Sequence, residues 1–146
     1  MTILDTNVLS ELMRPKPSPR VVAWVAKQPA TELSTTSITE AEILYGIELL
    51  TKGKHREGLL VAAEAMFAED LAGRVFGFES DAARVFSEIA AGRRALGRPI
   101  SHADAQIAAI AQVRSAKLAT RNVADFEDCS LDVVDPWNGE GKVAGR

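Results

Sequence analysis

The chain has 146 residues, of which 47% are apolar and 25% are charged, a composition typical of one soluble globular domain with a sizeable core. Its net charge of −3 argues against a protein that is held on nucleic acid by an overall positive field. The single cysteine excludes an internal disulfide framework, and no stretch is long and apolar enough to span a bilayer. We therefore expect a cytoplasmic protein.

The first predicted element is a short buried strand, Thr2 to Leu4, followed at once by an acid and then by a helix from Asn7 to Met13. Three prolines between Arg14 and Pro19 end that helix, because proline cannot continue it. The elements predicted after it are a helix that opens at Ser18 or Pro19, a strand at 32–36, helices at 38–50 and 56–71, a strand at 75–78, helices at 81–96 and 101–114, and strands at 117–120 and 131–134.

Strands that alternate with helices predict an α/β fold, in which a mostly parallel central sheet of about five strands is covered on both faces, a three-layer α/β/α sandwich. The helices at 38–71 look like a hairpin that projects from this sheet. The sequence contains no internal repeat and no linker. We expect one domain over residues 1–137 and a flexible, Gly-rich polar tail at 138–146.

Acids recur where a strand gives way to a helix or where a helix begins. In an open sheet, residues that follow the carboxyl ends of parallel strands lie along one edge, which favours convergence of these acids. Each acid also has an ordinary structural role as a helix cap or turn residue. Asp5 could cap the first helix, and Asp125 could lie in a turn after Asn122. Capping boxes could form between Thr39 and Glu42 or between Ser37 and Glu40, and another between Ser101 and Asp104.

Asp104 is the acid whose position argues most against a purely structural role. At helical spacing its neighbours are apolar, Ile107, Ala108 and Ala111, and a buried acid is costly unless it is paired or bound to metal. Periodicity does not choose between Glu40 and Glu42. Converging carboxylates need a cation, and oxygen ligands suit Mg²⁺ or Mn²⁺ better than zinc. Such a site is typical of phosphoryl chemistry.

Five segments along the chain carry a resemblance to a known family. They are Leu4–Glu11 (LDTNVLSE), Ser37–Gly46 (SITEAEILYG), Asp104 with 107–109, Ala119–Phe126 (ATRNVADF) and Asp135–Trp137 (DPW). With these segments in this order, the sequence resembles PIN-domain ribonucleases of the VapC toxin type, and within them the FitB-like branch.

The resemblance implies a PIN-like sandwich and a Mg²⁺-dependent endoribonuclease, with Mn²⁺ as an alternative ion, that cleaves RNA with a metal-activated water. It implies Asp5, Glu42 and Asp104 as acidic metal ligands, and it favours Glu42 over Glu40. Relatives differ in the fourth acid, which falls at the place of either Asn122 or Asp125. Since residue 122 is Asn, we expect Asp125 to be the fourth ligand. Supporting roles around the ligands fall to Thr6, Asn7, Thr120 and Asn122.

The resemblance also implies the toxin of a type II toxin–antitoxin pair, a homodimer inhibited by a small antitoxin that binds operator DNA. The apolar helices at 38–71 offer a groove for an antitoxin helix. Two alternatives remain open. One is a non-catalytic binding module within an antitoxin–DNA repressor complex, whose acids only cap helices. The other is a phosphatase-like hydrolase with Asp5 as nucleophile, which the residue at Asn7 disfavours because that chemistry normally needs an acid there.

Several other polar residues have a structural and a functional interpretation. His102 lies beside the expected site, but a solvated His is the better expectation. The basic groups at 52–56 and at Arg93, Arg94 and Arg98 are expected mostly to be solvated; the functional alternative is a phosphate-binding rim. Cys129 is expected to be a packing residue.

Overall fold

Five parallel strands form one sheet in the order β3-β2-β1-β4-β5. The computed structural model describes residues 1–138, so the predicted tail beyond Asn138 lies outside the described residues. The strands are β1 (Thr2–Leu4), β2 (Leu33–Thr36), β3 (Val75–Phe76), β4 (Lys117–Ala119) and β5 (Val133–Val134). The predicted α/β class with a parallel five-stranded sheet is confirmed.

Within residues 1–138, six α-helices connect the strands, and all but one lie within about two residues of their predicted bounds. The largest difference between predicted and observed bounds is at 56–71, where the α-helix begins two residues earlier than predicted and a π-helical turn, Met66–Asp70, replaces its last part. Within residues 1–138, none of the helices has the length and apolar character needed to cross a membrane. The helices are α1 (Thr6–Leu12), α2 (Pro19–Lys27), α3 (Ser37–Glu48), α4 (Lys54–Ala65), α5 (Ser80–Ala95) and α6 (His102–Val113).

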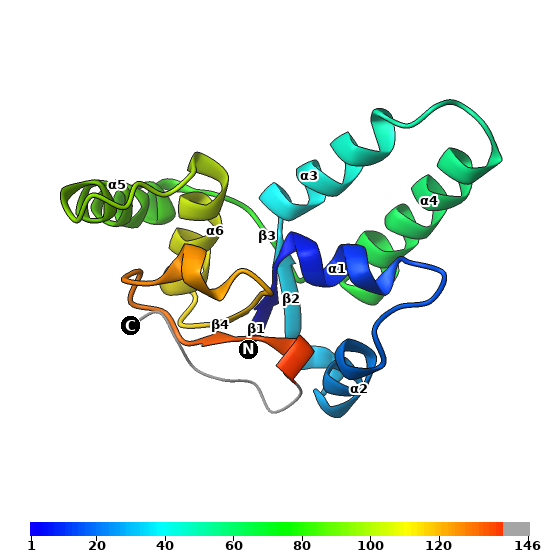
Figure 1. Cartoon of the computed structure of the whole chain (residues 1–146), viewed down its shortest axis with the longest axis horizontal. Helices are drawn as coiled ribbons and strands as arrows, with labels where there is room; N and C mark the ends of the chain where they lie inside the picture. The colour runs from blue at the N-terminus through cyan, green and yellow to red at the C-terminus, as the bar shows by residue number, and fades with distance from the viewer. Residues whose placement is uncertain (139–146) are drawn as a thin grey trace.

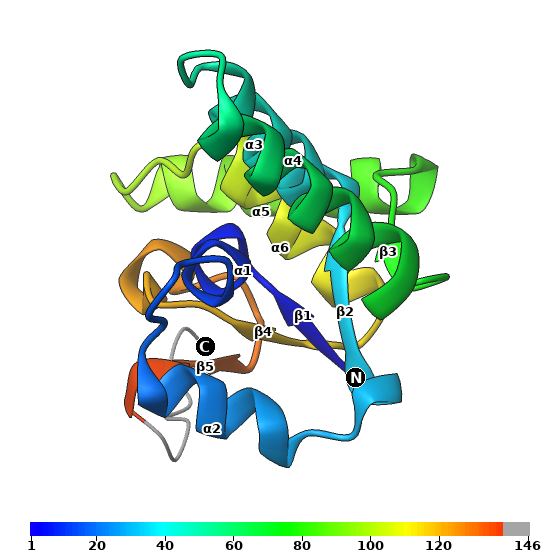
Figure 2. The same ribbon diagram turned by 90° about the vertical axis from the view of Figure 1, so that its right-hand side faces the viewer.

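Two hydrophobic cores lie on opposite faces of the sheet, because successive residues of a strand point to opposite faces. Ile3 and Leu118 pack with α5 and α6, whereas Leu4 and Ala119 pack with α1, α2, α3 and α4. Figure 1 shows α5 and α6 on one side of the strands and α1, α2 and α4 on the other, and the turned view in Figure 2 brings the second group toward the viewer. The predicted three-layer sandwich is therefore confirmed.

The pair α3 and α4 extends away from the sheet as an antiparallel hairpin (Figure 1). Its first helix follows β2 without any intervening loop, because Thr36 ends the strand and Ser37 begins the helix. Helix α3 therefore rises directly from the carboxyl end of a central strand.

Candidate functional site

The order of the strands reverses between β1 and β4. From β1 the chain adds β2 and β3 on one side, and it then crosses to add β4 and β5 on the other. Open α/β sheets bind ligands outside the carboxyl ends of the strands at such a switch point. Asp5 directly follows β1, and its N–H donates to the carbonyl of Ala119, the last residue of β4, at 2.9 Å. Asp5 therefore lies at the switch point.

The Asp5 carboxylate is 5% exposed and is held by three neighbours. Thr120 Oγ1 donates to Asp5 Oδ2 at 2.7 Å, and the Thr6 N–H donates to Asp5 Oδ1 at 2.8 Å. Asn7 Nδ2 lies 3.5 Å from Asp5 Oδ2 and donates to Thr120 Oγ1 at 3.1 Å. Burial raises the pKa of Asp5, the bonds from Thr120 and Thr6 lower it, and repulsion by Glu42 and Asp125 raises it further.

Glu42 on α3 is linked to Asp5 by Thr6, which donates a hydrogen bond to each of them. Thr6 Oγ1 donates to Glu42 Oε1 at 2.6 Å and shares a 3.1 Å hydrogen bond with the hydroxyl of Thr39. Neither predicted capping box forms at this helix. The N-cap is Thr36, whose Oγ1 accepts from the Thr39 N–H at 3.1 Å, so the structural role predicted for Glu42 is wrong.

Asp104 lies in the first turn of α6, where Ser101 caps the helix by accepting from the Asp104 N–H at 3.1 Å. Its pKa is raised to about 6, first by partial burial and next by repulsion from Asp5, while a hydrogen bond to the Ser101 side chain lowers it. Asp125 and Glu42 add further repulsion. The four predicted acids therefore act on one another electrostatically, although they come from four separate parts of the chain.

Asp125 is carried by a 3₁₀ turn, Val123–Phe126, that follows β4. Its N–H donates to the carbonyl of Asn122 at 3.0 Å, and the N–H of Asn122 in turn donates to Thr120 Oγ1 at 3.1 Å. The charge of Asp125 raises the pKa of both Asp5 and Asp104. Asn122 thus supports the turn, and Asp125 brings the fourth charge.

The fit of this set to a divalent cation is partial. The four side chains offer only carboxylate oxygens, the donors that Mg²⁺ and Mn²⁺ prefer. Their mutual repulsion, which adds to burial in raising the pKa of Asp104, is what a cation would relieve. Within residues 1–138, however, no three His, Cys, Asp or Glu side chains stand close enough together to form a metal site in their present positions. The donor chemistry therefore fits, whereas the positions of the side chains do not yet form a closed ligand set.

Two cavities adjoin the acids. A hollow of about 530 Å³ beyond the carboxyl ends of β4 and β5 is lined by Asn122, Asp125 and the exposed Arg121, among others. The Arg121 guanidinium lies over the Trp137 ring, 5.0 Å from its centroid. On the other side, an apolar groove of about 330 Å³ lies between α1 and the α3–α4 hairpin; Glu42 borders it together with Met13, Ile43, Ile47, Leu50 and Leu59.

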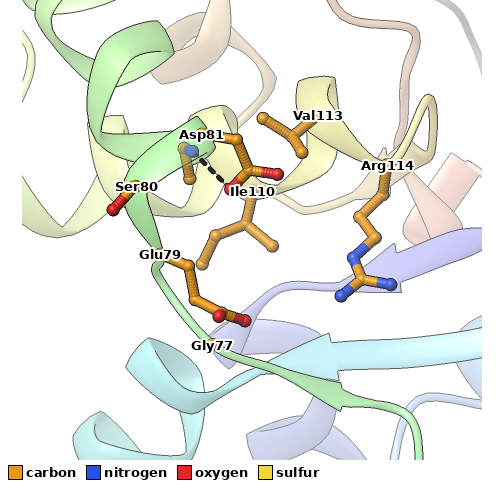
Figure 3. A pocket seen from close by; sticks show the side chains of 8 residues that line it. Gly77, Glu79, Ser80, Asp81, Ile110, Val113 and Arg114 are labelled. Atoms are coloured by element: carbon orange, nitrogen blue, oxygen red, sulfur yellow. Dashed lines mark hydrogen bonds between the residues drawn. The ribbon is translucent and has the colours of Figure 1, made fainter.

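A third pocket, also about 530 Å³, lies at the opposite end of α6 from Asp104. Figure 3 shows the Glu79 and Asp81 carboxylates and the Arg114 guanidinium around it. Arg114 also lies over the Phe76 ring, at 3.8 Å, and Asp81 Oδ1 accepts from the Ala82 N–H at 2.8 Å. Its charges are of both signs and it lies at the other end of α6, so this pocket is not part of the acidic site.

Arg93 differs from expectation, and Thr39 was not predicted. Arg93, expected in a solvated or phosphate-binding group, is 6% exposed, so both interpretations are wrong for it. His102 is exposed, as expected, and its ring packs edge-on against Phe86, with ring centroids 5.3 Å apart. Thr39, which steadies Thr6 beside Glu42, was not predicted as a site residue, and its only sequence signal is its place one helical turn before Ile43 on the buried face of α3.

The sequence matches the family model of the PIN domain over residues 2–129. It is 37% identical over 137 residues to a protein named VapC ribonuclease Y4jK from Sinorhizobium fredii, which covers 94% of this chain and 98% of that protein. It is 36% identical over 138 residues to Toxin FitB of Neisseria gonorrhoeae, covering 94% and 99%. A solved structure of FitAB bound to an IR36 DNA fragment superposes with a TM-score of 0.88 at 36% identity, over 94% of this chain and 96% of that one.

Proposed function

Because the chain belongs to the PIN-domain family, and matches VapC- and FitB-type toxins over nearly its whole length, we propose that it is the toxin of a toxin–antitoxin pair and a divalent-metal-dependent endoribonuclease. The observation that carries this proposal is the place of Asp5. It lies at the switch point of the sheet, nearly fully buried, and within the field of three further acids. A protein that used these acids only as caps would gain nothing from that mutual repulsion.

In this proposal Asp5, Asp104 and Asp125 would hold Mg²⁺, and Glu42 would bind it through water or orient the attacking water. When bound, the ion neutralises charge on the scissile phosphate and makes a water molecule more acidic. Burial and repulsion raise the pKa of Asp5, and they raise that of Asp104 to about 6, so a bound ion competes with protons for these carboxylates and binding is coupled to pH.

The remaining polar residues fix the geometry of the acids. The hydroxyl of Thr120 and the N–H of Thr6 each occupy one oxygen of Asp5, so this carboxylate cannot rotate freely. Asn7 ties Thr120 to the following segment, because its Oδ1 accepts from the Arg121 N–H at 3.1 Å. The hydroxyl of Thr6 restrains Glu42. A buried carboxylate with locked rotamers keeps its place when the substrate binds.

The hollow beside Asp125 is the proposed place for the RNA strand next to the scissile phosphate. Arg121 is exposed at its edge, and its guanidinium offers a phosphate contact beside a strongly acidic centre. Arg121 therefore provides a local positive charge for the RNA backbone, although the net charge of the chain is −3.

We propose that the partner is an antitoxin, because the toxin FitB relative is seen in a complex, FitAB, bound to a DNA fragment. The apolar groove between α1 and the α3–α4 hairpin suits the apolar face of one antitoxin helix. Since Glu42 borders this groove, an antitoxin seated there lies next to the acids. From the family resemblance, we also propose that the toxin itself forms a homodimer.

The test is cleavage of single-stranded and structured RNA by the purified chain with Mg²⁺, compared with the same reaction in EDTA. We expect cutting only with the ion, and none by Asp5→Asn or Asp104→Asn; Glu40→Gln, on the same helix as Glu42, is the matched control and keeps activity. The binding-module alternative has one observation in its favour, since Asp5 accepts the N–H of Thr6 at the start of α1. If Asp5→Asn lowers the melting temperature and no RNA is cut by the wild type, that alternative is correct.

A further inference from the structure

Arg93 is a buried cation near the end of α5, and its Nη1 reaches the segment that carries Asp125. Its Nη1 donates to the carbonyl of Asp125 at 2.8 Å and to that of Glu127 at 3.1 Å, and it lies 3.7 Å from Cys129 Sγ. Its Nε donates to the carbonyl of Arg98 at 2.7 Å. The side chain therefore fastens the segment that carries Asp125 to the end of α5.

A buried guanidinium is expensive, since several kcal/mol of hydration are lost unless the charge is compensated. In the part of the chain that the structure describes, no carboxylate forms an ion pair with Arg93. Its compensation comes from backbone carbonyls and one sulfur. An apolar side chain of similar volume would fill the same space at lower cost. The gain from Arg93 therefore lies in the conformation that it imposes on segment 125–129.

That conformation is one that the segment does not adopt easily. Asp128 and Ser130 have φ angles of 59° and 55°, in the left-handed region, which costs each non-glycine residue of order 1 kcal/mol. Arg98 holds the outer side of the same segment through ion pairs of 3.0 Å with both Glu127 and Asp128. A strained backbone conformation persists only where neighbouring contacts hold it in place. Here Arg93 and Arg98, at and just after the end of α5, provide those contacts.

We propose that Arg93 is a positioning residue for the acidic site: it clamps segment 125–129 so that the Asp125 carboxylate stays beside Asp5 and Asp104. The inference rests on the proposed function in one respect, that Asp125 is a metal ligand. Arg93 itself contacts neither metal nor RNA. It acts through the backbone of Asp125, whose carbonyl is held in place by the buried guanidinium.

The test is a double-mutant cycle between Arg93→Met and Asp125→Asn, read by Mn²⁺ affinity in calorimetry and by amide hydrogen exchange of residues 123–130. We expect R93M to weaken Mn²⁺ binding about tenfold, as losses around metal ligands do. We expect R93M with D125N to bind no more weakly than D125N alone, because the two changes remove the same contribution. Exchange in the segment should accelerate in R93M with or without metal.

The control is Ile89→Ala, one helical turn earlier on α5 and buried in the same core. It should cost stability comparable to R93M and leave both Mn²⁺ affinity and exchange at 123–130 unchanged. If R93M does not fold, Arg93→Lys, which keeps the charge but cannot span the carbonyls, carries the same comparison, with an expected loss of about threefold.

Two results overturn the proposal. In one, exchange at 123–130 accelerates in R93M while Mn²⁺ affinity is unchanged; in the other, the losses from R93M and D125N multiply in the double variant. A wild type without any Mn²⁺ affinity instead contradicts the proposed function. In that case the exchange measurement still decides separately whether Arg93 clamps the segment.

Discussion

Thr120 Oγ1 donates to Asp5 Oδ2 at 2.7 Å, across 115 residues of sequence. This bond joins the carboxyl ends of β1 and β4 at the point where the strand order reverses, and both residues are almost fully buried. The same hydroxyl accepts from Asn7 Nδ2 and from the N–H of Asn122. One threonine therefore connects the first acid, the segment after β4 and the start of α1.

Thr120→Val should destabilise the protein by about 1–3 kcal/mol at pH 7, because a buried carboxylate loses a charge-assisted donor and two other donors lose their acceptor. It should also weaken Mn²⁺ binding, since Asp5 becomes harder to ionise. Urea unfolding and metal titration measure the two effects. Thr120→Ser keeps the hydroxyl and should lie close to the wild type in metal affinity; equal losses in both variants would show that the methyl group matters rather than the hydrogen bond.

Asp104→Asn should stabilise the metal-free protein at pH 7 but not at pH 4. The pKa of Asp104 is raised from its usual 3.8 to about 6 in the folded state, so its protonation favours folding below about pH 3.8, and this contribution is lost as the pH rises through about 6. Because the side chain is only half-buried, solvent reduces the gain to about 1 kcal/mol. Urea unfolding in EDTA at the two pH values checks this. Destabilisation at both would mean that Asp104 acts mainly as a capping partner of Ser101.

Glu42→Gln and Glu40→Gln form a matched pair on α3. Gln at position 42 still accepts the hydrogen bond from Thr6 but carries no charge, so E42Q should keep its melting temperature and lose about 100-fold or more in kcat for RNA cleavage. E40Q should keep both. Single-turnover cleavage at saturating Mg²⁺ gives the comparison. A larger loss in E40Q than in E42Q would assign the third acid to Glu40.

Arg121→Ala should weaken RNA binding several-fold and flatten its salt dependence by somewhat less than one unit of slope, as expected for one lost phosphate contact on a single strand. Mn²⁺ affinity should not change, because Arg121 supports Asn7, beside Asp5, through its backbone N–H, which the substitution keeps. Fluorescence anisotropy with a non-cleavable RNA at several salt concentrations measures it. The control is Arg84→Ala, since Arg84 is an exposed arginine on α5, away from the hollow. An equal loss of RNA affinity in this variant would indicate a diffuse electrostatic effect.

The sequence was sufficient to predict that Asp5 follows the first strand at the edge of the sheet, because β1, Asp5 and the turn into α1 are contiguous. A buried strand, a capping acid and an apolar helix are local signals, and the alternation of elements sets the parallel sheet around them. The spacing of Asp104 on an apolar face was equally local. These features required no knowledge of which segments meet in space.

Other features depended on contacts that sequence spacing does not reveal. The cap of α3 is Thr36 because strand and helix join without a loop, whereas the predicted boxes assumed a later start. Arg93 looked like a solvated residue because the carbonyls that bury its charge lie 32 and 34 residues away.

In the proposed site, Asp5, Glu42, Asp104 and Asp125 share one divalent ion. Anomalous X-ray scattering from a crystal of the protein grown with Mn²⁺ locates that ion. We expect one strong peak within coordination distance of Asp5 and Asp104, which disappears in crystals of Asp5→Asn. Mn²⁺ bound only elsewhere, or four carboxylates still apart with no peak between them, would show that these acids do not form a metal site.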